Sequence, residues 1–528
     1  MRHGSQEGNG FTDMNETNFD FKSANDRRRK RRLISVIGVI LSVVFLVLAG
    51  IFVYLAVRTE FLTEVYLIII IAVLVILFGL EIFLTCNSRK KGRCIAGIII
   101  SLILSLCLGW ASFMVAKTYG VLNSITNPIS QVTHIGVFVL DDDEAVNIAG
   151  AADYTFGILQ EMDRENTDSA IEKINKKLDK SIKTYEYTGT IDMVNSLFDG
   201  NSGAIILNTG YLSLIKETEG YEDIESKIRE IETIAVKEKS DNKNSSEDDE
   251  EKEIKEVFTV LISGIDSRVG LVEKSRTDVN IIATVNTATK QVLLVSTPRD
   301  YFVPLSISNG ARDKLTHAGI YGIDVCMDTL GMLYDVDINY YFRVNFSGFE
   351  KIIDAVGGIT VYSDYDFYSY CSYDEIGKRL HYTRGENELD GTGALYFARE
   401  RYAFPTGDRQ RGENQMQVIK KVAEKLLSVE LLKNYSSIME TVQDSFETTV
   451  PYSTISSIVR NQLKKGGEWN IVSYGVDGYG STEAPYSLGG AYASVMIPNK
   501  ETVETAKELI DKVISGETVS VETGDVSE

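Results

Sequence analysis

Three long apolar runs close to the N-terminus limit most strongly what this chain can fold into. They cover Leu33 to Val57, Val65 to Leu84 and Ile95 to Ala116. Each is long enough to cross a hydrocarbon layer of about 30 Å as a helix. A cleavable signal peptide is not expected, because the first run is too long and two more follow it. We therefore expect three transmembrane helices within residues 33–116, preceded by a disordered tail over residues 1–32.

The basic residues between these runs predict the orientation of the chain. Six consecutive Arg and Lys residues, 27–32, precede the first run, and Arg89, Lys90, Lys91 and Arg93 separate the second from the third. The loop between the first two runs has only Arg58, with Glu60 and Glu64. Basic loops stay on the cytoplasmic side. We expect a multi-pass cell-membrane protein with a cytoplasmic N-terminus and extracellular domains after Lys117.

The remainder of the chain predicts two α/β domains. Residues 133–237 form a small accessory domain, with strands at 134–140, 183–188 and 204–207 and helices at 169–183 and 221–237. Residues 238–256 are a charged linker, and residues 515–528 are a flexible polar tail. Between them, residues 257–514 alternate strands and helices, which predicts a central mixed sheet covered by helices. Ligands of such sheets bind at strand ends.

Composition and missing motifs exclude several classes of function. The net charge of -21 argues against a nucleic-acid partner, since there is no basic face to neutralise phosphates in quantity. The four histidines have no metal or triad spacing, and no GxSxG, HExxH or Walker A motif occurs. Of the five cysteines, only Cys326 and Cys371 lie away from the apolar runs. Whether these two form a disulfide is left open by the sequence.

An arginine-rich stretch marks the candidate site. Arg399, Arg401, Arg409 and Arg411 fall within a dozen or so residues of an acidic protein. If the chain is extended at Arg399, then Arg399 and Arg401 share one face. A helix from Arg409 to Leu427 would place Arg411 and Gln415 one turn apart. Crowded guanidinium groups suit a phosphate or pyrophosphate. The alternative is local ion pairing with Glu400, Asp408 and Glu413.

Three further clusters of charge follow predicted strands. They are Asp266 with Arg268, Arg276 with Asp278, and Arg299 with Asp300. Carboxylates at strand ends supply the hard oxygen ligands that Mg²⁺ prefers, and neighbouring arginines could hold phosphate oxygens. The alternative is that each aspartate caps a turn and pairs with its own arginine. Because all three clusters and the arginine-rich stretch belong to one domain, we favour a site for an anionic ligand.

Several separated segments of this domain resemble the LytR-CpsA-Psr family of Gram-positive cell-envelope proteins. They are ISGIDSR, SRTDVNIIATVN, VSTPRD, KLTHAG, VNFSGFEKIIDAVGGI, LDGTGALYFARER and GDRQRGENQMQVI, in this order between about Val257 and Ala423. Three spans followed by an accessory domain also resemble the streptococcal capsule-associated and LytR-like type. Small departures occur at Thr277, where the family often has Ser, and at Thr316, where it often has Asn. The family also commonly has an Arg-Gln pair near residues 412–414.

The resemblance implies a transferase that moves a teichoic acid or capsular polysaccharide from a polyprenyl-pyrophosphate carrier onto peptidoglycan. It implies Mg²⁺, with Mn²⁺ as a substitute, bound by Asp266 and Asp278. The residues that it assigns to the pyrophosphate are Arg276, Arg299, Arg399, Arg401, Arg411 and Gln415. The catalytic residues that it implies are Asp266, Asp278, Arg299, Arg399, Arg401 and Asp408. Asp266 or Asp408 could accept the proton of the attacking hydroxyl, and the sequence does not choose between them.

Two other functions stay open at this point. With water as the acceptor, the same site would make a polyprenyl-pyrophosphate phosphatase. A non-enzymatic regulator, such as a transcription attenuator, is disfavoured by the expected topology and by the lack of a basic DNA-binding helix. The lipid would need an apolar groove, and the strand from Val257 to Ile262 with the helix from Phe349 to Val356 could line it. Ordinary core packing explains those residues equally well.

Overall fold

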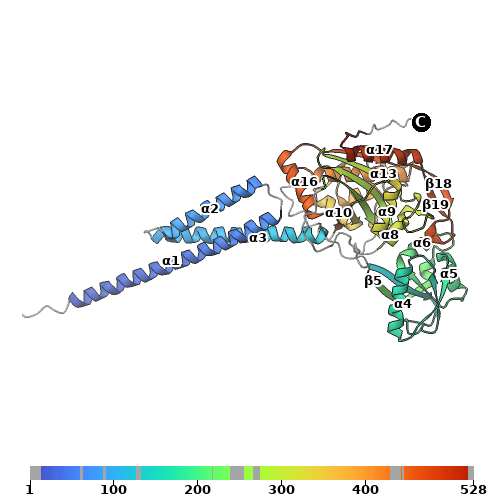
Figure 1. The fold of residues 1–528 in the computed structure, drawn as a ribbon, viewed down its shortest axis with the longest axis horizontal. Coiled ribbons are helices and arrows are strands. Elements are labelled where there is room, and N and C mark those ends of the chain that lie inside the picture. Colours follow the sequence, from blue (N-terminus) through green and yellow to red (C-terminus); the bar gives the residue numbers. More distant parts are fainter. Residues whose placement is uncertain are drawn as a thin grey trace, which may run out of the picture. The chain divides into compact units, whose positions relative to one another are not determined.

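A computed structural model describes residues 13–59, 64–86, 91–126, 132–216, 218–237, 255–265, 274–428, 442 and 445–520 (Figure 1). The chain divides into two compact units, Met1–Gly120 and Val121–Glu528. The first unit consists of helices, and the second holds all of the described β-sheets.

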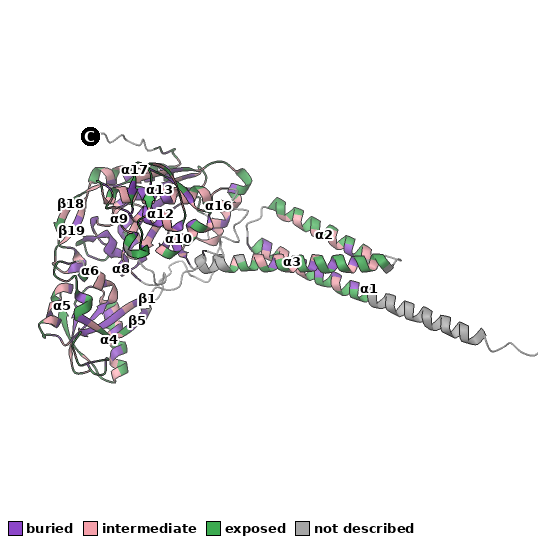
Figure 2. Cartoon of the chain, turned by 180° about the vertical axis from the view of Figure 1, so that it is seen from behind, coloured by how far each residue is buried: buried purple, intermediate pink, exposed green. Residues whose placement is uncertain are grey.

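Three helices make up the first unit. They are α1 (Asp13–Arg58), α2 (Glu64–Cys86) and α3 (Lys91–Thr126). Residues 36–58, 64–84 and 92–117 of these helices are long and apolar enough to cross a membrane. Phe45 stacks on Phe78 at 6.3 Å between ring centroids. Many large apolar residues of these helices are exposed, as the exposed stretches in Figure 2 show. This outward apolar surface is the pattern of helices that lie in lipid.

The start of α1 differs from the expectation. The helix begins at Asp13, whereas we expected a disordered tail as far as residue 32. No glycine or proline interrupts residues 13–32. Asp13 and Glu16 are in the first turn, where negative charge favours a helix, and the helix of the first span extends to this point.

The accessory domain is a five-stranded sheet with helices. The strand order is β3-β2-β4-β1-β5, and β5 is antiparallel to β1 at one edge. The strands are β1 (Val132–Leu140), β2 (Thr155–Leu159), β3 (Lys183–Tyr187), β4 (Ala204–Asn208) and β5 (Ile228–Lys237). The helices are α4 (Arg164–Leu178), α5 (Thr190–Phe198), η1 (Thr209–Tyr211), α6 (Leu212–Lys216) and α7 (Ile224–Lys227).

The helix predicted over residues 221–237 is wrong. Only Ile224–Lys227 is helical, and the rest of the segment is β5. The apolar residues Ile228, Ile231 and Ile234 are spaced by three, as on a helix. In the structure this spacing comes from an irregularity in the register, where Val137 and Phe138 of β1 pair with Glu232 and Glu230. The extra residue, Ile231, is a bulge that breaks the two-residue alternation of the strand.

A six-stranded mixed sheet organises the second α/β domain. Its strand order is β16-β11-β6-β7-β8-β17, with β6 parallel to β11 and antiparallel to β7. The strands are β6 (Val257–Ile265), β7 (Thr277–Asn286), β8 (Gln291–Ser296), β11 (Tyr340–Asn345), β16 (Phe446–Thr448) and β17 (Asn470–Gly475). The expected α/β class with a mixed sheet covered by helices is confirmed.

Helices cover both faces of this sheet. On one face, α9 (Ile323–Tyr334) and α17 (Lys500–Ser515) pack against Leu261, Ile282 and Leu293. The other face carries Val260, Ile281 and Ala283 and packs against α13 (Asp408–Leu426) and α16 (Tyr452–Lys465). Helices α10 (Phe346–Ala355) and α12 (Gly391–Arg399) join α13 on this side.

Short elements complete the domain. They are β9 (Phe302–Pro304), β10 (Arg312–Lys314), η2 (Leu315–His317), α8 (Ala318–Tyr321), β12 (Ile359–Ser363), β13 (Phe367–Tyr368), α11 (Tyr373–Ile376), β14 (His381–Tyr382), β15 (Gly385–Leu389), β18 (Gly478–Glu483), η3 (Tyr486–Leu488) and β19 (Ala493–Pro498).

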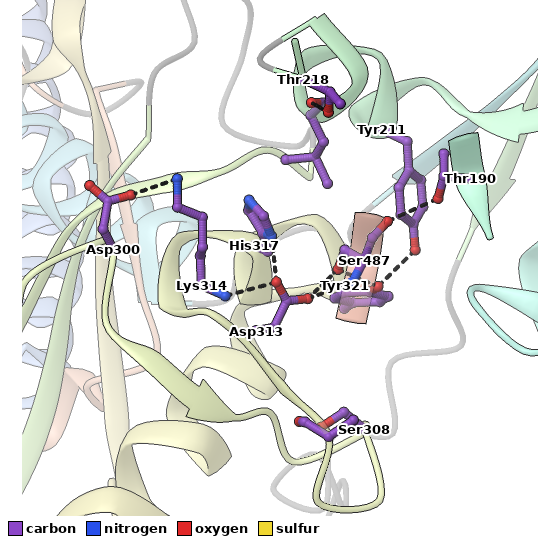
Figure 3. Close-up of polar contacts among 12 residues, drawn as sticks. Thr190, Tyr211, Thr218, Asp300, Ser308, Asp313, Lys314, His317, Tyr321 and Ser487 are labelled. Carbon is purple, nitrogen blue, oxygen red and sulfur yellow. Dashed lines mark hydrogen bonds and ion pairs between the residues drawn. The ribbon is translucent and has the colours of Figure 1, made fainter. Parts of the chain in front are cut away.

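A buried polar network joins the accessory domain to the second domain (Figure 3). Tyr211 donates a hydrogen bond to the hydroxyl of Tyr321 at 2.9 Å, and Thr190 donates to the carbonyl of Ser487 at 2.9 Å. Asp313, which is fully buried, accepts from the backbone N–H of Ser487 and lies 2.6 Å from Nδ1 of His317. His317 is therefore a structural residue of this network. The two domains also share one hydrophobic cluster.

Candidate functional site

A deep apolar cavity lies between the central sheet and the helices of one face. It has a volume of about 680 Å³ and is bounded by β6, β7, β11, α10, α12, α13 and α16. Val260, Ile262, Phe349, Ile352 and Ile353 are among the apolar residues that line it. The strand and the helix that we named as candidates for a lipid groove thus both contribute to its wall. A cavity lined in this way accommodates a hydrocarbon chain.

One part of the cavity wall is polar and charged. The residues that form it are Asp278, Arg299, Arg399, Arg401, Arg411 and Gln415. These residues come from β7, the segment after β8, the end of α12 with the loop that follows it, and the first half of α13. The structure therefore brings together residues that are up to 137 positions apart (415 − 278) and that the sequence predicts for one site.

Arg299 and Asp278 form an ion pair in this charged wall. Nη1 of Arg299 lies 2.6 Å from Oδ1 of Asp278, and both side chains are largely shielded from solvent. Asp300, the next residue, pairs through Oδ1 with Nζ of Lys314 at 3.0 Å. Burial alone would raise the pKa of Asp300, but Lys314 and Arg299 more than offset it and lower the pKa. Asp300 is thus ionised and holds Lys314 rather than facing the cavity.

Arg399 is held in place by a carboxylate and an aromatic ring. Its Nη1 lies 2.9 Å from both Glu375 oxygens, and its guanidinium lies 4.2 Å from the centre of the Phe346 ring. The expectation that the chain is extended at Arg399 is wrong, because α12 continues through this residue and only Glu400 is extended. The five consecutive residues 394–398 of this helix are all buried, and this burial decides the local structure.

Arg401 and Arg411 share one carboxylate. Oδ1 of Asp408 lies 3.1 Å from Nη2 of Arg411 and 3.7 Å from Nη1 of Arg401. Asp408 itself does not line the cavity. Burial lowers the pKa of Arg411, and the nearby Arg299 and Arg401 lower it further against the effect of Asp408. Burial is thus the main effect that disfavours the positive charge of Arg411, and an anion in the cavity would stabilise that charge.

Glu400 shapes the loop that presents these arginines. Its carboxylate is fully buried, and one oxygen accepts the backbone N–H groups of Arg401, Tyr402 and Ala403 at 2.8 to 3.1 Å. The other oxygen accepts the backbone N–H groups of Tyr370 and Cys371 at 2.6 and 3.5 Å. Glu400 thus joins two segments of backbone, and the ion pair that we considered for it is replaced by hydrogen bonds to amides.

The other predicted residues have more peripheral places. Arg409 is half-exposed and pairs with Glu413 and Asp477 at 3.5 and 3.4 Å. Gln415 donates to the carbonyl of Ala398 at 3.3 Å, which fixes its side chain at the cavity wall. Arg276 precedes β7 and is not part of the cavity wall. Cys326 and Cys371 are both free thiols, and Cys371 alone lines the cavity.

Of the two aspartates predicted to bind magnesium, Asp266 and Asp278, the structure describes only Asp278. Asp266 and Arg268 lie outside the described residues. Within the described part of the chain, no group of three or more His, Cys, Asp or Glu side chains could hold a metal. Mg²⁺ commonly takes one or two protein carboxylates and completes its shell with water and substrate phosphate. Asp278, at the charged wall of the cavity, fits that kind of site, in which the protein supplies few of the ligands.

Three contributors to the site were not found from the sequence. Glu375 orients Arg399, Lys314 holds Asp300, and Tyr402 accepts a hydrogen bond from Nη2 of Arg401 at 2.6 Å. Glu375 is 24 positions from Arg399, and no motif or periodicity links the two. Of the three, only Tyr402 could have been found from the sequence, because it directly follows Arg401 in the chain.

Comparison with known proteins assigns the chain to a family. Residues 224–508, more than half of the chain, match the LytR_cpsA_psr family, and the chain belongs to it. A similar relative is the polyisoprenyl-teichoic acid–peptidoglycan teichoic acid transferase TagU of Enterococcus faecalis, which is 38% identical over 39% of this chain and 65% of that protein. TagU of Bacillus subtilis is 32% identical over 43% of this chain and 70% of that protein.

The match to these relatives covers only part of either protein. The chain spans 65% of the length of the E. faecalis transferase, which is just under two thirds. Among solved structures, B. subtilis TagV aligns with 50% of this chain and 99% of its own length, at 24% identity and a TM-score of 0.42.

Proposed function

We propose that this protein is a membrane-anchored transferase that attaches an anionic glycopolymer to peptidoglycan. The donor is a polyprenyl-pyrophosphate-linked teichoic acid or capsular polysaccharide. The relatives named as teichoic acid transferases support this class of reaction. The three apolar helices support the anchoring. Extracellular placement of the domains after Lys117 is part of the proposal, since carrier and acceptor both lie outside the cell.

The observation that carries the proposal is that one cavity has both an apolar lining and a wall of arginines. We call Arg299, Arg399, Arg401 and Arg411 the arginine wall. A polyprenyl pyrophosphate has a long apolar tail that ends in a dense negative charge. The cavity of about 680 Å³ has a mostly apolar lining that also includes Arg299, Arg399, Arg401 and Arg411. A site for a soluble phosphate ester would not need the apolar part, and a simple lipid site would not need four partly buried cations.

The arginines are arranged to bind and polarise the pyrophosphate. Arg399 is oriented by Glu375 and Arg401 by Tyr402, so both guanidinium groups are positioned before substrate arrives. Such preorganised cations stabilise the charge that develops on the phosphate oxygens. A hydroxyl of peptidoglycan attacks the sugar-linked phosphorus. The bond to the bridging oxygen breaks, and polyprenyl phosphate leaves.

A bound Mg²⁺ would add charge neutralisation at the same phosphates. Asp278 would be one of its ligands, and Asp266 the other. The proton of the attacking hydroxyl passes to a carboxylate, with Asp408 and Asp266 as the candidates. Asp408 pairs with Arg401 and Arg411 and neutralises part of their charge. If Asp408 accepts the proton, it loses its negative charge. Arg401 and Arg411 are then free to neutralise the product phosphate.

The experiment is a transfer assay on arginine variants of the full-length protein. Arg399→Ala and Arg401→Ala should each lower transfer by about 100-fold or more with unchanged thermal unfolding. Arg409→Ala is the matched control, because Arg409 is exposed and does not line the cavity. Unchanged transfer in both site variants would contradict the proposal.

A phosphatase is the second candidate that the same geometry supports. Water in place of the hydroxyl acceptor would release the glycopolymer with a terminal phosphate. The peptidoglycan dependence of pyrophosphate cleavage separates the two functions, since a transferase should be stimulated by the acceptor and a phosphatase should not.

A further inference from the structure

We infer that exposed tyrosines beside the arginine wall form a carbohydrate-binding rim that takes the first sugars of the lipid-linked donor. We define the tyrosine rim as Tyr370, Tyr373 and Tyr402. These residues are 46%, 58% and 66% exposed, respectively. Large aromatic side chains left this open to solvent mark a binding surface rather than a core. The inference rests on the proposed function, because that function decides which ligand reaches the rim.

Backbone contacts hold the rim next to the charged wall. The buried carboxylate of Glu400 accepts from the backbone N–H groups of both Tyr370 and Tyr402, so their main chains meet at one side chain. Tyr373 begins α11, and Glu375 of the same short helix holds Arg399. Tyr402 and Cys371, which adjoins Tyr370, both line the cavity. The rim is therefore continuous with the site of the pyrophosphate.

Two of the rings have an arginine against one face. The guanidinium of Arg379 lies 4.2 Å from the centre of the Tyr370 ring, and that of Arg401 lies 4.7 Å from the centre of the Tyr402 ring. These stacks restrict the rings and place a cationic donor against one face of each ring. Aromatic rings of this kind give contact area at low cost in conformational entropy. The flat C–H face of a pyranose packs on such a ring, while guanidinium groups meet its hydroxyl, phosphate or carboxylate groups.

The order of parts in the donor decides the occupant. The polyprenyl tail needs the apolar cavity and the pyrophosphate needs the arginines. The group attached to the outer phosphate must then extend past Arg399 and Arg401, where the rim lies. Tyrosines also occur at membrane surfaces. We favour the sugar because the rim adjoins the charged part of the cavity wall, whereas the tail belongs with its apolar part.

The test compares two soluble donor analogues on the full-length protein in nanodiscs by calorimetric titration. One is farnesyl pyrophosphate, and the other is the same lipid pyrophosphate carrying a disaccharide. For the wild type we expect tighter binding of the sugar-bearing probe. In the double variant Tyr370→Ala and Tyr373→Ala, that probe should bind about tenfold more weakly, while farnesyl pyrophosphate binds as before. Tyr402 is left intact, because it also holds Arg401.

Tyr185→Ala is the matched control, since Tyr185 is 59% exposed on β3 of the accessory domain. It should leave both affinities unchanged. Equal wild-type affinity for the two probes, or equal weakening of both in the double variant, would overturn the carbohydrate rim in favour of a lipid or membrane contact. If Arg411→Ala still weakens binding of both probes by about 10-fold or more in that case, the proposed function stands. Absence of farnesyl pyrophosphate binding to the wild type would overturn both.

Discussion

The carboxylate of Asp278 lies 2.6 Å from the guanidinium of Arg299 in the charged wall of the cavity. The two groups neutralise each other, and each holds the other in position. Under the proposed function, Asp278 would be a ligand of Mg²⁺ and Arg299 would contact a phosphate oxygen. Binding of the donor with Mg²⁺ would then replace this ion pair by contacts to the ligands.

Replacing Asp278 by Asn tests this arrangement. The variant keeps the size of the side chain but removes its charge, so it should bind Mg²⁺ about 10- to 100-fold more weakly. A titration of transfer activity against Mg²⁺ should show the curve displaced to higher concentration. If the transfer activity of Asp278→Asn depends on Mg²⁺ concentration in the same way as that of the wild type, a metal role for Asp278 is contradicted.

Arg411 and Arg409 should respond differently to replacement. Arg411 lines the cavity and its pKa is lowered by burial, whereas Arg409 is exposed and pairs with Glu413. Arg411→Ala should weaken binding of a lipid pyrophosphate by about 10- to 100-fold, because a charged hydrogen bond to phosphate is lost. Arg409→Ala should change it by less than about threefold. Calorimetric titration measures both, and similar effects would contradict the assignment of Arg411 to the anion site.

Glu400→Gln should destabilise the loop that carries Arg399 and Arg401. A glutamine can turn only one oxygen toward the five backbone N–H groups that the carboxylate accepts. The NH₂ group of the glutamine would then point at backbone N–H groups, which cannot accept a hydrogen bond from it. The expected cost is about 1–3 kcal/mol, read as a lower denaturation midpoint, together with faster proteolysis near residue 402. If Glu400→Gln is as stable as the wild type, the negative charge of Glu400 is not required to hold these backbone N–H groups.

Gly489→Ala tests the contact between the accessory domain and the second domain. Gly489 has φ +59, and a Cβ there would lie 2.2 Å from Cα of Gly189. Because the three nearest atoms all belong to the backbone of Gly189 and Thr190, the two domains must move apart. Tyr211 and Thr190 would then lose their partners across the interface (Figure 3). We expect separate unfolding transitions for the two domains in calorimetry. Gly490→Ala also lies at positive φ but has open space around its Cβ, so it controls for backbone strain.

Regular local patterns in the sequence predicted the fold well. The three apolar runs, the alternating strands and the helix that became α13 depend on residues close in the chain, so periodicity identifies them. The pattern failed at β5, where the bulge at Ile231 imitates the spacing of a helix. It also failed at Arg399, where burial of α12 against the core outweighs any local preference.

The site was predictable only in part. Arginines at the ends of strands and helices identified most residues of the charged wall, since such residues converge at one edge of a sheet. The partners that orient them did not follow from the sequence, because Glu375 and Lys314 reach Arg399 and Asp300 through tertiary contacts. The apolar cavity is likewise a property of packing, and its residues have the same composition as a core.

The most direct test of the transferase is to follow the fate of the glycan. The full-length protein would be incubated with a polyprenyl-pyrophosphate-linked oligosaccharide, Mg²⁺ and peptidoglycan fragments, and the products identified by mass spectrometry. We predict an oligosaccharide joined to peptidoglycan through one phosphate, which disappears with EDTA. Release of the phosphorylated oligosaccharide without linkage would contradict the transferase and indicate a phosphatase.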